Sequence, residues 1–266
     1  MTLLVIPYPE IDPVLFEIGP LAIRWYALSY IAGLILAWRY MRWATLPQPG
    51  GPNPVKIDDF LAWATIAVVL GGRLGYVLFY RPGYYLENPL SALEVWQGGM
   101  SFHGGFLGVV IAAILFCRKN KIAYMRLGDL LGVAAPIGLF FGRLANFVNG
   151  ELYGRAADAP WALVFPHDPL QIPRHPSQLY EAALEGLVLF LVMHLLFSLT
   201  RLKDMPGALM GCFVMGYGLA RIAAEFFREP DAHLGFLIGP VTMGQILSVP
   251  MVLIGLTIFI WARKRA

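Results

Sequence analysis

Charged residues are scarce in this sequence: they make up 14% of the 266 residues, whereas hydrophobic residues make up 58%. Soluble domains usually contain about 25% charged residues, so a water-soluble fold is excluded. Long apolar runs are present instead, and a bilayer is crossed by roughly 20 such residues. We predict an all-α, multi-pass membrane protein with one integral membrane domain, 1–266, and about seven spans: 21–43, 58–80, 101–117, 128–148, 178–198, 206–227 and 243–262.

Basic residues are absent before Arg24. A cleaved signal peptide needs a basic region at its start, so the first run is expected to remain as a span. If the N-terminus lies outside, all five lysines fall in cytoplasmic loops or the C-terminal tail, as the positive-inside rule requires. The net charge of +3 reflects this bias, and no nucleic-acid partner is predicted. The segment 47–54 is expected to be a cytoplasmic turn.

Only two cysteines are present, Cys117 and Cys212, at or near the expected cytoplasmic ends of their spans. Disulfides are rare in that compartment, so we interpret both as packing residues. The segment of about 149–177 is rich in proline, which argues against a continuous helix there. We expect it to form a loop on the outer face, followed by Ser177 as the N-cap of the fifth span.

A few arginines lie deep within apolar runs, where a charged side chain costs several kcal/mol or more. They are Arg73, Arg143 and Arg221. The expected topology places all three in the outer half of the bilayer, with His103 and Glu181 at the same depth. Such a one-sided pocket differs from a solute pathway, which needs polar residues through the full thickness.

Two helix faces could supply partners for these arginines. Tyr217, Arg221, Glu225 and Arg228 recur at helical spacing, and so do Gln178, Glu181 and Glu185 on the preceding span. One interpretation is a structural ion-pair ladder that holds helices together. The other is a supporting shell around an anion site, made of Tyr217, Glu225, Arg228, Arg73 and Glu181.

The motif SFHGGFLG, residues 101–108, offers two interpretations as well. His103 could act as a base, since histidine titrates near neutral pH. Alternatively, the glycines could form a close helix interface, with His103 bonded to a carbonyl. The presence of Arg143 and Asn146 favours the first interpretation, because a base beside an anion site is typical of a transfer enzyme.

Together with GRLANFVNGELYGR, HPSQLYEA and YGLARIAAEFFREPD, this motif resembles the bacterial phosphatidylglycerol–prolipoprotein diacylglyceryl transferase family. The resemblance extends over nearly the whole chain. It implies a seven-helix enzyme of the bacterial inner membrane, N-terminus outside and C-terminus cytoplasmic, acting in lipoprotein biosynthesis. Such enzymes move the sn-1,2-diacylglyceryl group of phosphatidylglycerol to the lipobox cysteine thiol in a prolipoprotein signal peptide. A thioether forms, glycerol 1-phosphate leaves, and no metal or other cofactor is needed.

The resemblance also implies which residues act. Those matching the family's functional positions are Tyr26, His103, Arg143, Asn146, Glu151, Gly154 and Arg221. Arg143 and Arg221 are expected to stabilise the leaving phosphate, and His103 to take the thiol proton. Asn146 is expected to bind the headgroup glycerol or to fix Arg143, Glu151 to bind phosphatidylglycerol, and Gly154 to permit a special backbone turn.

Two rival functions stay open at this point. A transporter of a lipid or small anionic solute would need polar residues in the inner half of the membrane and often paired broken helices. A non-catalytic scaffold would depend on His103 and Arg143 for folding alone.

Overall fold

The computed structural model describes residues 6–265, apart from 10, 20, 46–50, 231–234, 236 and 238. Half of the predicted turn at 47–54, residues 47–50, therefore lies outside the described residues. The chain divides into two compact units. Unit 1 comprises Met1–Tyr40 and Gly128–Ala266, and unit 2 comprises Met41–Leu127.

Six helices in the described part of the chain are long and apolar enough to cross a membrane, so the chain is a multi-pass membrane protein. They are α2 (Pro54–Phe79), α4 (Phe102–Asn120), α5 (Tyr124–Val148), the helix Ser177–Leu199, α8 (Ala208–Glu225) and α9 (Met243–Lys264). The first predicted span forms α1 (Trp25–Thr45), which has tryptophan, tyrosine and arginine among its 21 residues and is not one of the six. All predicted spans end within about one helical turn of the observed helices.

The chain is mostly helical, as predicted, but it also contains two small sheets that the predicted all-α class does not include. In one, β1 (Ile6–Pro7) pairs with β4 (Leu163–Val164), which pairs with β5 (Pro173–Arg174). In the other, β2 (Val14–Ile18) and β3 (Leu21–Arg24) form an antiparallel hairpin. Residues 21–24 are thus a strand and not the start of the first span. The absence of a long helix from 149–177 is confirmed.

The start of the fifth span also differs from the prediction. Pro176 is its N-cap residue, and Ser177 is the first residue of the helix. The Ser177 hydroxyl donates instead to the carbonyl of Leu152, at 3.1 Å. This side chain therefore fastens the loop to the helix, and the predicted N-cap is wrong.

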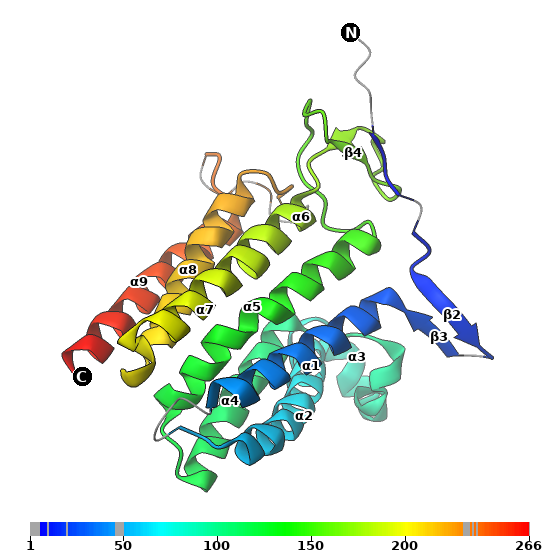
Figure 1. Cartoon of the computed structure of the whole chain (residues 1–266). Helices are drawn as coiled ribbons and strands as arrows, with labels where there is room; N and C mark the ends of the chain where they lie inside the picture. The colour runs from blue at the N-terminus through cyan, green and yellow to red at the C-terminus, as the bar shows by residue number, and fades with distance from the viewer. Residues whose placement is uncertain are drawn as a thin grey trace. The chain divides into compact units, whose positions relative to one another are not determined.

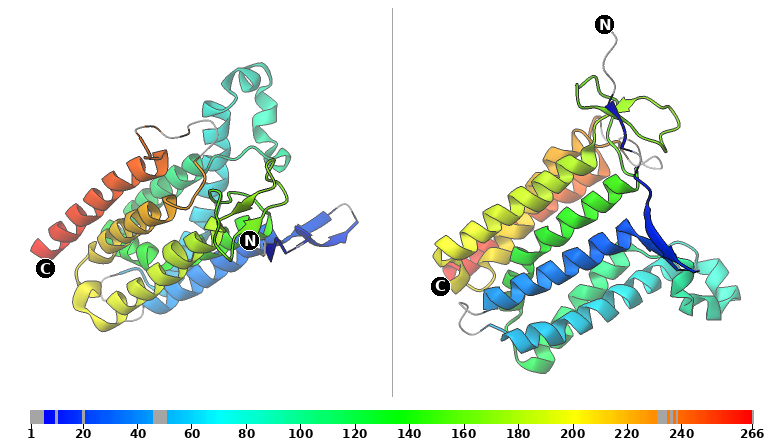
Figure 2. Two further views of the ribbon diagram at one scale, coloured as in Figure 1. Left: turned by 90° about the horizontal axis from the view of Figure 1, so that it is seen from above. Right: turned by 45° about the vertical axis from the view of Figure 1, so that its right-hand side comes forward.

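Within unit 1, α5 lies between α1 and the helix Ser177–Leu199 (Figures 1 and 2). Glycines make both contacts close. A Cβ atom built on Gly33 of α1 would lie 3.3 Å from the Cα of Gly138, and one on Gly186 would lie 2.6 Å from the Cβ of Phe140. The helix 177–199 has α-helical ends, α6 (Ser177–Glu181) and α7 (Leu189–Leu199), around a π-helical centre, η3 (Ala182–Val188).

The N-terminus of α8 is capped by a residue of another helix. Asp129, near the start of α5, is fully buried. Its two carboxylate oxygens accept from the backbone N–H groups of Gly207 at 2.8 Å and Met210 at 2.9 Å. Gly207, which follows the short turn η4 (Arg201–Asp204), has no side chain for this purpose. A carboxylate at a helix N-terminus is favourable for both hydrogen bonding and the helix dipole, so Asp129 ties α5 to α8.

In unit 2, the glycines of SFHGGFLG form the close helix interface that the sequence left open. A Cβ atom on Gly104 would collide with the carbonyl oxygen of Gly71, and one on Gly108 with that of Ala67. The helices α2 and α4 therefore approach each other at backbone distance. This confirms the packing role of the glycines and leaves the role of His103 open.

Arg73, predicted to belong to the shell around the anion site, has a different set of contacts. Its guanidinium donates to the carbonyls of Ser91, Ala92, Gly98 and Gly99, at 2.5–3.3 Å. These carbonyls belong to the connection between α2 and α4, which contains α3 (Pro82–Glu87), η1 (Pro89–Leu93) and η2 (Val95–Gln97). Arg73 thus stabilises a loop of unit 2. The sequence shows only one arginine within an apolar run and does not indicate this role.

Candidate active site

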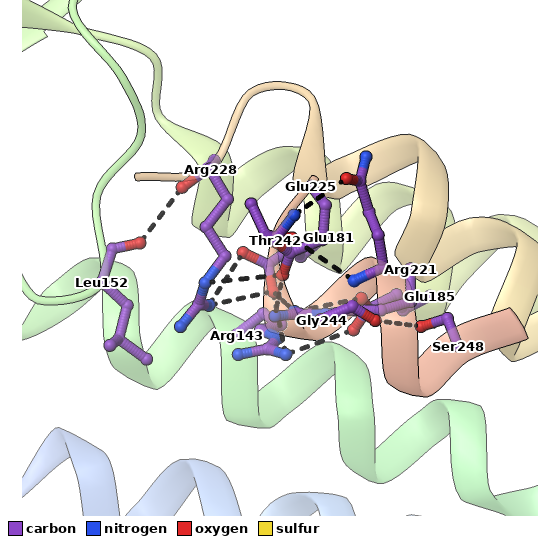
Figure 3. A network of polar contacts seen from close by, with 12 residues as sticks. Arg143, Leu152, Glu181, Glu185, Arg221, Glu225, Arg228, Thr242, Gly244 and Ser248 are labelled. Carbon is purple, nitrogen blue, oxygen red and sulfur yellow. Dashed lines mark hydrogen bonds and ion pairs between the residues drawn. The ribbon is translucent and has the colours of Figure 1, made fainter. Parts of the chain in front are cut away.

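Three arginines and three glutamates form one network in unit 1, and they come from α5, the helix Ser177–Leu199, α8 and the residues just after α8 (Figure 3). They are Arg143, Glu181, Glu185, Arg221, Glu225 and Arg228. The predicted pairs of Arg221 with Glu225 and of Glu225 with Arg228 are both present. The predicted second face supplies Glu181 and Glu185, and the network therefore joins three helices.

Glu181 is the centre of this network. One of its oxygens lies 2.8 Å from Nη2 of Arg143 and 2.6 Å from Nη1 of Arg221. Nη1 of Arg228 lies 3.4 Å from both oxygens. Glu185, in the π-helical segment, is more distant, 3.3 Å from Arg143 and 3.5 Å from Arg221. Both carboxylates are fully buried, so they hold the arginines from the protein side.

Arg143 keeps donor groups for a ligand. Its contacts with the described residues all involve Nη2, so Nε–H and the Nη1 group have no partner in the described part of the chain. Its side chain is 18% exposed, whereas those of the two glutamates are 0% exposed. A partly exposed, oriented guanidinium with vacant donors can bind a phosphate bidentately.

Glu225 is held from two sides. Its carboxylate pairs with Arg221 and accepts from the hydroxyl of Thr242 at 2.6 Å. Thr242 is also the N-cap of α9, in a capping box with Gln245. Gly244 leaves room for this carboxylate, because a Cβ atom there would collide with it. Glu225 therefore connects α8 to the start of α9.

We predict that Glu225→Gln lowers the free energy of unfolding by about 1–3 kcal/mol, because Arg221 loses one buried carboxylate partner. The loss is limited because Glu181 still pairs with Arg221. Thermal unfolding in detergent measures this effect. Asp59→Asn is a suitable control, since it removes an exposed ion pair with Lys56 and should change little. A Glu225→Gln protein of unchanged stability but without activity would contradict the structural assignment.

Asn146, Glu151 and Tyr26 belong to the same unit and lie near Arg143. The amide of Asn146 donates to the carboxylate of Glu151 at 2.8 Å, and the side-chain amide of Gln178 donates to the carbonyl of Glu151 at 2.6 Å. The phenol of Tyr26 interacts electrostatically with both Arg143 and Glu151. The sequence-predicted residues Tyr26, Arg143, Asn146 and Glu151 are thus brought together.

Gly154 lies where three segments meet. Its N–H donates to the carbonyl of His175 at 2.9 Å, and the next residue donates to the carbonyl of Phe227 at 2.9 Å. A Cβ atom on Gly154 would lie 2.6 Å from the His175 oxygen and closer still to that of Phe227. Its φ is not in the left-handed region, so the predicted special turn is wrong: close backbone packing is what requires glycine here.

Gly154→Ala should therefore destabilise the junction of the loop with α8, by about 1–3 kcal/mol or more, as overpacking does. We expect lowered thermal stability together with strongly reduced activity. Gly138→Ala is the matched control, because a Cβ atom there meets nothing within 4 Å and alanine favours a helix. Equal behaviour of the two variants would exclude the steric explanation.

A buried ion pair fixes the loop around Gly154. Arg174 donates to both oxygens of Asp168, at 2.6 and 3.0 Å, and also to the carbonyl of Gly154 at 3.3 Å. The Arg174 guanidinium holds the pKa of Asp168 below its usual value. Glu229 lies 3.2 Å from Arg174 on the other side. These contacts hold the loop that follows α5 against Gly154.

Two further predicted site residues are Tyr217 and His103. Tyr217 lies on α8 and interacts with Glu185, Arg221 and Arg143. His103 is exposed near the start of α4 and belongs to unit 2, so its role as the base stays a prediction.

Several supporting residues escaped the sequence reasoning. Thr242 and Gly244 come from α9, far along the chain, and only the Thr242–Gln245 capping-box spacing could have indicated a helix start. Asp168 and Arg174 carry no spacing signal. Arg155, whose guanidinium donates to the carbonyls of Glu225 and Arg228 at 3.1 and 2.9 Å, also required the structure.

Comparison with known proteins identifies the family of the chain. A family model described as prolipoprotein diacylglyceryl transferase matches residues 13–261. The chain is similar to proteins named phosphatidylglycerol–prolipoprotein diacylglyceryl transferase. It is 61% identical to that of Paramagnetospirillum magneticum, covering 97% of this chain and 96% of the relative. It is 59% identical to that of Azospirillum brasilense, with coverages of 99% and 98%, and 58% identical to that of Rhodospirillum rubrum, with 98% and 96%. The chain belongs to the prolipoprotein diacylglyceryl transferase family.

Proposed function

We propose that this protein transfers the sn-1,2-diacylglyceryl group of phosphatidylglycerol to the lipobox cysteine of prolipoproteins. Family membership supports the reaction. The observation that carries the proposal is the pair of partly exposed arginines, Arg143 and Arg221, which come from different helices to one buried carboxylate. The family names do not favour a transporter.

The reaction requires one proton transfer and one displacement. The thiol of the lipobox cysteine gives its proton to a base, for which we propose His103. The thiolate attacks the glyceryl carbon bonded to the phosphate oxygen, a C–S bond forms, and the C–O bond breaks with its electron pair going to oxygen. Glycerol 1-phosphate leaves, and its growing negative charge is stabilised by Arg143 and Arg221.

We further propose a single membrane domain with seven crossings in the bacterial inner membrane. The N-terminus and the loop 149–177 lie outside, the C-terminus is cytoplasmic, and the active site lies in the outer half of the bilayer. The positive-inside distribution of the lysines supports this orientation. At headgroup depth a lipid phosphate is available to the arginines, which explains their position in apolar helices.

The direct test is an in vitro assay with phosphatidylglycerol and a lipobox peptide. We expect the purified protein to convert the peptide to its diacylglyceryl thioether, and Arg143→Ala to lose nearly all of this activity while it still inserts and folds. Absence of the thioether with the wild-type protein would contradict the function.

The protein's own cysteines are not expected to take part. Both are free; Cys117 is buried and Cys212 half-buried. We predict that replacing both with alanine leaves turnover within about twofold, because the nucleophilic thiol belongs to the substrate. The assay above measures this. A glyceryl adduct on either cysteine, detected by mass spectrometry, would overturn direct transfer.

A further inference from the structure

The ion network around Arg143 has equal numbers of positive and negative residues. Arg143, Arg221 and Arg228 face Glu181, Glu185 and Glu225 (Figure 3). Two flanking residues, Glu151 and Arg155, contribute one charge of each sign. The side chains named here therefore carry no net charge when all are ionised, although the proposed ligand is an anion.

A bound phosphodiester would add one negative charge to this balanced network. The arginine side chains are partly exposed, at 18% for Arg143 and 14% for Arg221, whereas Glu181 and Glu185 are fully buried. The phosphate can thus reach the arginines while the carboxylates remain behind them. Excess charge in a low-dielectric site is costly, and such sites bind or release a proton instead.

Among the three carboxylates, Glu185 is held by the longest contacts. Glu181 contacts three arginines, two of them within 2.8 Å. Glu225 has its pair with Arg221 and the Thr242 hydroxyl at 2.6 Å. Glu185 has contacts of 3.3 and 3.5 Å with the same two arginines that would bind the phosphate. Competition for those arginines therefore weakens Glu185 first.

The groups that face Glu185 are consistent with this assignment. Arg143 faces it from α5, Arg221 and Tyr217 face it from α8, and Glu181 lies one turn earlier on its own helix. Once a phosphate occupies the two arginines, Tyr217 and Glu181 offer no positive charge in compensation. A protonated carboxyl group is neutral and no longer requires the two arginines as charge partners.

We propose that Glu185 takes up one proton from solvent when phosphatidylglycerol binds to Arg143 and Arg221, which makes it a further substrate-binding residue. The proposal rests on the proposed function, because the ligand is the phosphodiester of that lipid. The proton moves to a carboxylate oxygen of Glu185, no bond to carbon changes, and the proton returns to solvent when the site empties.

Calorimetry of the wild-type protein in a non-ionic detergent tests the proton uptake. Short-chain phosphatidylglycerol is titrated at one pH in buffers of different ionisation enthalpy, and the dependence of the heat on the buffer counts the protons. We expect about one proton per lipid bound. Its Kd should then rise about tenfold per pH unit over the range in which the empty site is ionised.

Infrared difference spectra identify the group. Lipid binding should produce the band of a protonated carboxyl group, and Glu185→Asp, which keeps a carboxylate, should shift that band. Glu181→Asp should leave it in place. A band shifted only by Glu181→Asp, or binding with no proton uptake, would overturn the inference. Absence of any binding of phosphatidylglycerol would instead contradict the proposed function.

Discussion

Arg143→Lys is expected to lower turnover by about 10²–10³-fold, nearly as much as Arg143→Ala, although the positive charge is retained. A preorganised donor to a developing oxyanion contributes this much to other enzymes. Arg143 reaches Glu181 and Glu185 through Nη2 alone, and its remaining N–H groups keep the planar geometry that a phosphate needs. A lysine ammonium can pair with the carboxylates or the phosphate but cannot present two parallel donors.

The in vitro assay and a stability measurement test this prediction together. The variant should still insert and fold, since Arg221 and Arg228 continue to compensate Glu181. Arg81→Lys provides the control, because Arg81 is an exposed residue before α3 and should tolerate the change. Turnover of Arg143→Lys close to wild type would mean that charge alone is sufficient.

His103→Gln should remove most of the turnover, by about 10²–10⁴-fold, the usual contribution of a general base. Glutamine keeps hydrogen-bonding capacity but cannot accept the proton at neutral pH. Binding of phosphatidylglycerol should be almost unchanged. Raising the pH should partly restore activity, because a free thiol ionises at about pH 8.5 without help from a base.

The lipid affinity and the pH–rate profile of this variant distinguish two roles. A residue that only orients the lipid, or packs at the start of α4, would lose affinity together with turnover, and alkaline pH would restore nothing. His167→Gln is the matched control, since His167 is an exposed histidine of the loop after α5. Its profile should follow that of the wild type.

The helices and the charged faces could be predicted from the sequence because both depend on local spacing. Arg221 and Glu225 are four residues apart, so a helix brings them together without further information. Glu181 could be predicted as a candidate partner because it shares a helix face with Gln178 and Glu185. The distances from the three arginines to the Glu181 carboxylate depend on how the helices pack, so they could be obtained only from the structure.

The errors have a common physical origin in long-range contacts. The strands β4 and β5 are two residues each, too short for an alternating pattern, and they form only because distant segments pair with them. Serine is a residue type that often caps helices, but the Ser177 hydroxyl donates to the carbonyl of Leu152 instead. Arg73 resembled the site arginines in its position within an apolar run, but its guanidinium contacts the carbonyls of a loop.

The bond from α8 to Asp129 has a consequence for the lengths of two helices. The same number of residues separates Asp129 from Arg143 and Gly207 from Arg221. Each arginine therefore lies roughly 21 Å along its helix from the hydrogen bond between Gly207 and Asp129. A single-residue deletion between Asp129 and Arg143 would turn this side chain by about 100° around the helix axis. Substitutions among the apolar residues of these stretches leave the two arginines aligned, whereas insertions and deletions do not. We therefore expect this part of the protein to tolerate changes in composition better than changes in length.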